Sequence, residues 1–357
     1  MSTPTIHSPW ARVLGVGAAL SLVVGVIVIA FSWPGIASEP QNLPVAFVGP
    51  TEQLAQVQGA LDENAPGVIV PVDADDRAAA VDLIETREAY GAVIIGAEPE
   101  VLTASAASPA VAQMLTGMAA QLQAQANAAA AAQAAAAGVQ APVITVTVTD
   151  VVPLADTDPR GVGLAASAFP LVLGGMIGGI AITIALVGAW RRVVALAAYA
   201  VVAGFVVAGI LQGWFGVLQG DYLVNAAAYA LAFAAIGAPI VGFAALVGRA
   251  GIALGPVLFL LIANPISSAA QPVEFLPEPW GAIGQWFPPG AAATLLRELS
   301  YFPAADTTFP WLVLAGWAAA GVLLALVGHF RQTGAASREA VEDAENESRE
   351  EHLVSPA

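Results

Sequence analysis

Long apolar runs without a charged residue constrain this chain more than any other feature. Residues 13–33 contain no Asp, Glu, Lys or Arg, and about 20 apolar residues suffice to cross about 30 Å of hydrocarbon. Five more runs share this character, at residues 168–190, 193–215, 224–247, 252–270 and 310–330. The chain is 58% hydrophobic and 11% charged, unlike soluble globular domains. The sequence therefore predicts an α-helical multi-pass membrane protein with six transmembrane helices in a lipid bilayer.

The first run also has the position of a signal peptide, because the small residues GIAS follow it at 35–38. A signal peptide has an apolar core of about 7–15 residues, and this run is longer. Only one basic residue, Arg12, precedes it. We therefore expect an uncleaved anchor, so that residues 1–33 form the cytoplasmic N-terminus and the first transmembrane helix.

The arginines indicate the orientation in the membrane. If the N-terminus is inside, the basic residues on the inner side are Arg12, Arg191, Arg192, Arg249 and Arg331. The outer loops then hold the acidic residues Asp221, Glu274, Glu278 and Asp306. This is the positive-inside pattern, with Arg160 and Arg297 as the basic residues of the outer side. We expect both termini in the cytoplasm.

The segment between the first two runs, residues 34–165, has a different composition. From residue 39 to 160 it holds 15 acidic residues against three arginines. Short β-branched runs such as LPVAFVGP, GVIVPV and AVIIG alternate with helical patterns, which indicates a small α/β unit with a largely parallel sheet. We therefore expect an acidic extracytoplasmic α/β domain, inserted between transmembrane helices 1 and 2.

Two details of this domain have alternatives. The aspartates of VDADDR lack the Gly and distal Glu of an EF-hand loop, so a solvated helix N-terminus is favoured over a calcium site. The Ala-rich helix at 111–137 has a narrow apolar stripe over its first turns. We favour packing of this helix on the domain's own sheet over self-association.

Residues 166–330 are expected to form a five-helix membrane domain, followed by an acidic cytoplasmic tail at 331–357. The tail is either a short charged helix or disordered. Within the membrane domain, GGMIGG at 174–179 permits close helix contact, either inside the subunit or across a dimer.

The residue types exclude several kinds of chemistry. All eleven basic residues of the Lys/Arg class are Arg, so the Lys of a GxxxxGK[ST] phosphate-binding loop is missing. The three histidines, His7, His329 and His352, are scattered, and the chain has no Cys. We expect no enzymatic activity, no catalytic residue, no metal, no cofactor and no nucleic-acid partner. The apolar runs contain no Asp, Glu, Lys or Arg, which argues against an ion-coupled transporter and favours an energy source outside the chain.

A helix break interrupts the connection between the last two runs. In GAIGQWFPPGAAATLLRELSYF, Pro288, Pro289 and Gly290 are expected to end one short helix and start another, because Pro suits the first helical turn. Arg297 and Glu298 lie in the second helix, with Arg297 snorkelling to headgroups or the pair facing a substrate exit. The alternative is an interfacial amphipathic hairpin.

Several motifs resemble one family when their order is considered. ANPISSAAQPVEFLPEPWGAIGQWFPPGAAATLLREL places Pro265, Pro277, Pro279, Pro288 and Arg297 in an order similar to that before the last span of type-two ABC exporter permeases. DPRGVGLAASAFPLVLGGMIGG and LTASAASPA also look like this group. The chain resembles its large-ectodomain branch, related to the Pip-like (phage infection protein) membrane proteins.

The resemblance implies a permease subunit in the bacterial plasma membrane, a homodimer or heterodimer that works with a separate ATPase subunit. It would export a hydrophobic or amphipathic compound, and residues 272–302 would form a re-entrant outer hairpin. The expected substrate-pathway residues are Asn264, Pro265, Gln212, Asn225, Arg297 and Glu298. The expected ATPase contacts are Arg191, Arg192 and Arg249, although the inner turn before span three is little more than Trp190 and two arginines. The alternative function is a non-transporting scaffold or receptor whose ectodomain binds a cell-envelope or secretion partner.

Overall fold

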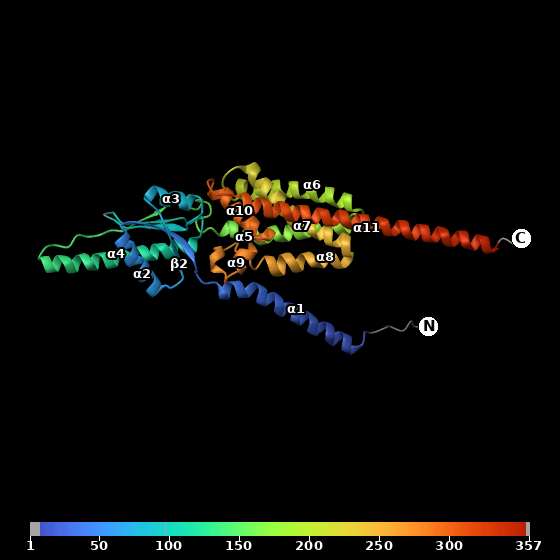
Figure 1. Ribbon diagram of the computed structural model, residues 1–357, viewed down its shortest axis with the longest axis horizontal. Coiled ribbons are helices and arrows are strands. Elements are labelled where there is room, and N and C mark those ends of the chain that lie inside the picture. Colours follow the sequence, from blue (N-terminus) through green and yellow to red (C-terminus); the bar gives the residue numbers. More distant parts are fainter. Residues whose placement is uncertain (1–7, 97, 355–357) are drawn as a thin grey trace.

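The computed structural model describes residues 8–96 and 98–354. The molecule is elongated, with an α/β region at one end and long helices at the other (Figure 1). The N-terminal end of α1 and the C-terminal end of α11 both lie at the end remote from the sheet (Figure 1). The arrangement separates an α/β region from a helical region along the long axis.

Among the described residues, five helices are long and apolar enough to cross a membrane. They are α1 (Trp10–Ala37), α5 (Val162–Ala185), α6 with its continuation (Ala189–Trp214), α7 (Tyr222–Val247) and the first part of α11 (Thr308–Arg331). The α-helical part of α6 ends at Ala208, and a π-helix, η1 (Gly209–Trp214), follows it. The length and apolar composition of these helices agree with a multi-pass membrane protein.

The run predicted as a span at 252–270 is a shorter helical segment in the structure, so six spans are not confirmed. It consists of α8 (Arg249–Gly255) and a π-helix, η2 (Pro256–Ala263). Pro256 opens the π-helix because its nitrogen cannot donate the hydrogen bond that would continue α8. The segment Arg249–Ala263 would extend about 22 Å at the α-helical rise, which is shorter than the hydrocarbon layer.

Helix α7 is the centre of the helical region, and α5, α6 and α11 all pack against it. Tyr229, Ile236 and Ile240 on α7 are fully buried. On α5, a Cβ at Gly175 would lie 2.7 Å from Cβ of Ile236, and one at Gly179 would lie 2.9 Å from the Gly237 carbonyl oxygen. The GGMIGG stripe therefore packs inside the subunit, and these contacts supply no argument for a dimer.

The α/β region contains a five-stranded sheet in the order β2-β1-β3-β4-β5. Its strands are β1 (Leu43–Val48), β2 (Ile69–Asp73), β3 (Gly91–Ile94), β4 (Glu100–Thr103) and β5 (Thr147–Asp150), and its helices are α2 (Thr51–Asn64), α3 (Arg77–Glu85) and α4 (Pro109–Ala137). All neighbouring strands are parallel except β3 and β4, which are antiparallel. The predicted largely parallel sheet is confirmed. Its core includes Phe47, Ile84 and Leu102, which are fully buried.

The structure decides between the alternatives for the aspartates of VDADDR and for the Ala-rich helix. Asp76 accepts a hydrogen bond from the Ala79 nitrogen at 2.9 Å and caps α3, so the aspartates mark a helix N-terminus. The first half of α4 packs on the sheet through Val111 and Leu115. Its second half is held by Asn127, whose side chain bonds the main chain of Ile144 on the returning segment.

The break at Pro288 separates α9 (Trp280–Gly284) from α10 (Pro288–Tyr301). A short 3₁₀ turn, η3 (Val273–Phe275), precedes them. Helix α10 lies between the two regions: Leu295 is buried in the helical core, and Phe302, just after the helix, is buried in the core of the sheet. This hairpin therefore joins the α/β region to the long helices.

The acidic segment after residue 330 continues α11 (Thr308–Val354). This is the helical alternative of the two that the sequence left open. Residues 355–357 lie outside the described part of the chain.

Candidate functional site

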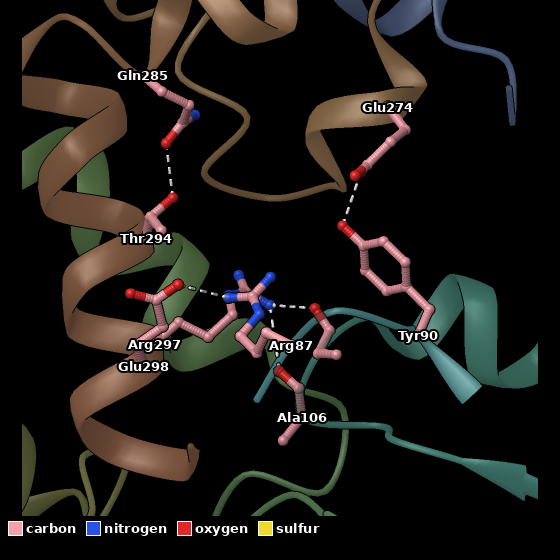
Figure 2. A network of polar contacts seen from close by, with 9 residues as sticks. Arg87, Tyr90, Ala106, Glu274, Gln285, Thr294, Arg297 and Glu298 are labelled. Atoms are coloured by element: carbon pink, nitrogen blue, oxygen red, sulfur yellow. Dashed lines mark hydrogen bonds and ion pairs between the residues drawn. The ribbon is translucent and has the colours of Figure 1, made fainter. Parts of the chain in front are cut away.

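Polar side chains from distant parts of the chain meet where α10 contacts the α/β region. We call this group the polar junction and define it as Arg87, Tyr90, Glu274, Arg297 and Glu298 (Figure 2). Arg87 and Tyr90 lie between α3 and β3, Glu274 belongs to η3, and the last two belong to α10. Three elements separated in sequence therefore supply one cluster.

Arg297 connects the two regions through main-chain carbonyl groups. Its guanidinium donates hydrogen bonds to the carbonyl oxygens of Ala106 at 3.4 Å, Ala107 at 2.9 Å and Ala269 at 3.0 Å. Burial, with the nearby Arg87 charge, lowers the pKa of Arg297 to about 10, so the side chain stays protonated at neutral pH. The planar fork of Arg suits this set of acceptors, which a Lys ammonium would contact as a point charge.

Glu298 faces Arg87 instead of its neighbour in the sequence. An oxygen of Glu298 lies 3.9 Å from a guanidinium nitrogen of Arg87, whose guanidinium carbon is 5.2 Å from the ring centroid of Phe302. Glu298 is only 8% exposed. Burial raises the pKa of Glu298 to about 7, because desolvation disfavours the charged carboxylate more than Arg87 stabilises it.

Tyr90 makes the remaining contact of the junction with η3. Its hydroxyl donates a hydrogen bond to Glu274 at 2.7 Å, and burial raises the pKa of the Tyr90 hydroxyl. Within the hairpin, Thr294 on α10 donates to Gln285 beside α9 at 2.7 Å (Figure 2). These bonds hold the hairpin and the α/β region in one arrangement.

The junction corrects the sequence interpretation of Arg297 and Glu298. Arg297 does not snorkel toward headgroups, because its donors bond protein carbonyls, and its ionic partner is not Glu298. Sequence reasoning missed Arg87, which has φ of 66° and follows the end of α3. Nothing in the sequence around Arg87 indicates that its partner would be Glu298, more than 200 residues later.

The other predicted pathway residues lie in two separate places. Gln212 and Asn225 meet: the Asn225 amide donates to Gln212 at 3.0 Å and to the Gln219 carbonyl at 2.8 Å. Gln212 in turn donates to the Gly220 carbonyl at 2.9 Å. Asn225 is fully buried, and the bonds close the connection between η1 and α7. Their observed role is to hold this turn.

Asn264 and Pro265 lie at the end of η2, away from that pair. They line a cavity of about 260 Å³ whose walls come from α1, α5 and the segment after η2. The structure therefore does not bring the predicted pathway residues together into one path.

The predicted ATPase contacts lie at the end of the helical region remote from the sheet (Figure 1). Arg191 and Arg192 belong to the first turn of α6, and Arg249 is the first residue of α8. Arg192 donates to the Leu186 carbonyl at 2.8 Å and so supports its own turn. Arg191 and Arg249 are exposed.

A larger cavity of about 570 Å³ lies between α5, η1 and α7. We call it the α5–α7 cavity. Its lining is mostly apolar, with Leu171, Ile210 and Phe233 among the wall residues, and the side chains of Thr157, Asp158 and Ser167 supply its polar groups. Volumes of 300–1,000 Å³ and apolar walls with a few polar groups are typical of small-molecule sites. Sequence reasoning missed this cavity because its walls come from segments far apart in the sequence, on α5, η1 and α7.

Comparison of the chain with protein-family models, with curated proteins and with solved structures gives no match.

Proposed function

We propose that this protein is the membrane subunit of an ABC-type exporter in the bacterial plasma membrane, using a separate ATPase to move a hydrophobic or amphipathic compound outward. The observation that carries the proposal is the α5–α7 cavity, an apolar space of about 570 Å³ among candidate membrane-spanning helices, with a few polar groups in its lining. Such a space suits a molecule with an apolar body and a polar head.

The lack of charge in the apolar runs supports an external energy source. Ion-coupled transporters place ionisable groups within their spans, where they bind the coupling ion. The six runs of this sequence contain no Asp, Glu, Lys or Arg. The driving reaction therefore belongs to a partner, and exposed Arg191 and Arg249 offer a positive surface to it.

The proposed topology places both termini and these arginines in the cytoplasm and the α/β region outside. The first turns of α1, α6 and α8 carry their arginines at one end, and the α/β region lies at the other (Figure 1). A common basic end follows the positive-inside pattern. In this topology Arg249–Ala263 is a short fifth membrane segment, and the α9–α10 hairpin re-enters from the outer side beneath the α/β region. Two subunits would complete the pathway.

The proposal is tested by purifying the tagged full-length protein from its native membranes in mild detergent and identifying the proteins that accompany it. We expect an ATPase subunit with a phosphate-binding loop, and we expect Arg191→Glu with Arg249→Glu to remove it. Arg160→Glu is the matched control, because Arg160 is also exposed but lies beside the α/β region. Recovery of no ATPase from membranes that retain the protein would refute an ATP-driven exporter.

A scaffold or receptor is the second candidate, favoured by a groove in the α/β region. A cavity of about 810 Å³ lies between α2 and α4, with Leu61, Met114 and Met118 among its walls and glutamines around it. If the purification recovers an envelope or secretion protein, and deletion of α2 abolishes its recovery, the scaffold replaces the exporter.

A further inference from the structure

The polar groups of the α5–α7 cavity share one property: their hydrogen-bond donors are already used. The Thr157 hydroxyl donates to the Gly216 carbonyl at 2.6 Å, and the Ser167 hydroxyl donates to the Leu164 carbonyl at 2.7 Å. The Ser167 oxygen also lies 3.4 Å from the Tyr229 hydroxyl, where either atom can be the donor, so it keeps at least one lone pair that can accept a bond. The Thr157 oxygen likewise keeps lone pairs that can accept a bond. Both side chains therefore offer acceptors to a molecule in the cavity.

Asp158 adds an anionic acceptor to the lining. Its two oxygens accept from the nitrogens of Val162 at 3.0 Å and Gly163 at 2.7 Å, which caps α5. A carboxylate has about four lone-pair positions, so two bonds leave capacity for a ligand. The cap also fixes the carboxylate at the wall, since Gly163 itself lines the cavity.

The main chain around the cavity follows the same pattern. Pro170 has no N–H, so the Ala166 carbonyl lacks its usual α-helical donor, and both residues line the cavity. The N–H groups of two other lining residues are taken: Phe215 donates to the Ile210 carbonyl at 2.9 Å, and Val217 donates to the Leu211 carbonyl at 2.8 Å. The lining includes no Arg, Lys or His.

We infer that the α5–α7 cavity binds compounds with an apolar body and a neutral or cationic head that donates hydrogen bonds, such as a primary alkylamine, and rejects carboxylates of the same shape. A carboxylate would bring only acceptors to a wall of acceptors beside the Asp158 charge. Leaving polar groups unpaired in an apolar site lowers affinity strongly. This inference rests on the proposed function, because it names the substrate class of that site.

The test uses the absence of cysteine from the chain. Ala166→Cys places a unique thiol on the cavity wall, and Gln140→Cys places one on an exposed loop of the α/β region as the control. Full-length variants in lipid nanodiscs are labelled with a maleimide while decylammonium, decyltrimethylammonium or decanoate is titrated at equal free concentrations. The three probes share one chain and differ in head charge and in donors.

We expect decylammonium to slow labelling of Ala166→Cys at concentrations roughly tenfold lower than decyltrimethylammonium needs for the same effect. Decyltrimethylammonium carries the same charge but has no N–H, so it cannot form the charge-assisted hydrogen bond that decylammonium forms. Decanoate should give no protection, and Gln140→Cys should be unaffected by all three. Adding Asp158→Asn should reduce the preference for decylammonium while leaving an acceptor for the α5 cap.

The inference would be overturned if decanoate protected Ala166→Cys as well as decylammonium does. It would also be overturned if decylammonium protected Gln140→Cys as well as it protects Ala166→Cys. The labelling needs no ATPase. Recovery of an ATPase without selective protection therefore refutes only this inference, and selective protection without an ATPase refutes only the exporter.

Discussion

Glu298→Gln should stabilise the protein at pH 8 and have a much smaller effect at pH 5. Burial raises the pKa of Glu298 from its ordinary value of 4.5 to about 7, against the opposing effect of Arg87 and with a small contribution from Asp306. Because the folded protein binds this proton more tightly than the unfolded chain, the stabilisation is complete below the unfolded pKa. It is lost as the pH rises to the folded pKa.

The magnitude follows from the size of the shift. One pKa unit corresponds to 1.36 kcal/mol, so ionising Glu298 in the folded state costs about 3 kcal/mol relative to ionising it in the unfolded chain. Gln is neutral at every pH and has nearly the same shape. The variant therefore does not lose stability when the pH rises. The difference in the free energy of unfolding between Glu298→Gln and the natural protein should grow by about 2–3 kcal/mol between pH 5 and pH 8.

Denaturant unfolding of the detergent-purified protein, followed by tryptophan fluorescence at both pH values, measures this difference. Glu100→Gln is the control, because its pKa is lowered mainly by a hydrogen bond from Arg77, so its contribution is lost as the pH falls. It should show no gain at pH 8. An advantage of Glu298→Gln that is the same at pH 5 and pH 8 would refute the account, since Glu298 would then not titrate between them.

Three further predictions concern the junction, the bundle and the topology. Arg297→Ala should destabilise the protein by about 3 kcal/mol or more, because buried carbonyls lose a charged donor. Arg297→Lys should recover part of this loss in the same unfolding assay, and equal stability of the natural protein and both variants would contradict the prediction. Gly175→Leu should lower the unfolding midpoint of the subunit even at high dilution, since its Cβ would meet Ile236; a change confined to the oligomeric state would contradict it. Cysteines at Gln56 and Asp221 should react with an impermeant thiol reagent in intact cells, and labelling of Ser337→Cys would overturn the topology.

Local properties of the sequence determined the membrane character and the elements of the α/β region. Hydropathy depends on composition within one segment, so the run at 224–247 could be recognised and corresponds to α7 (Tyr222–Val247). The order of β-branched runs and helical patterns likewise indicated the largely parallel sheet, and the Asp before residue 77 indicated the start of α3. The break at Pro288 could be located because Pro restricts its own backbone wherever it occurs.

The tertiary structure decided what depends on contacts between distant residues. The pairing of Arg87 with Glu298 has no local signal, and the destination of Arg297 depends on the Ala106–Ala107 carbonyls that α4's preceding loop presents. The GGMIGG stripe permits contact with any close surface, and only the positions of α7 and α6 showed which surfaces it meets. The α5–α7 cavity is space left between three helices, where Pro170 and the π-helix interrupt regular packing. Such space is a property of the assembled helices, because no single segment contains it.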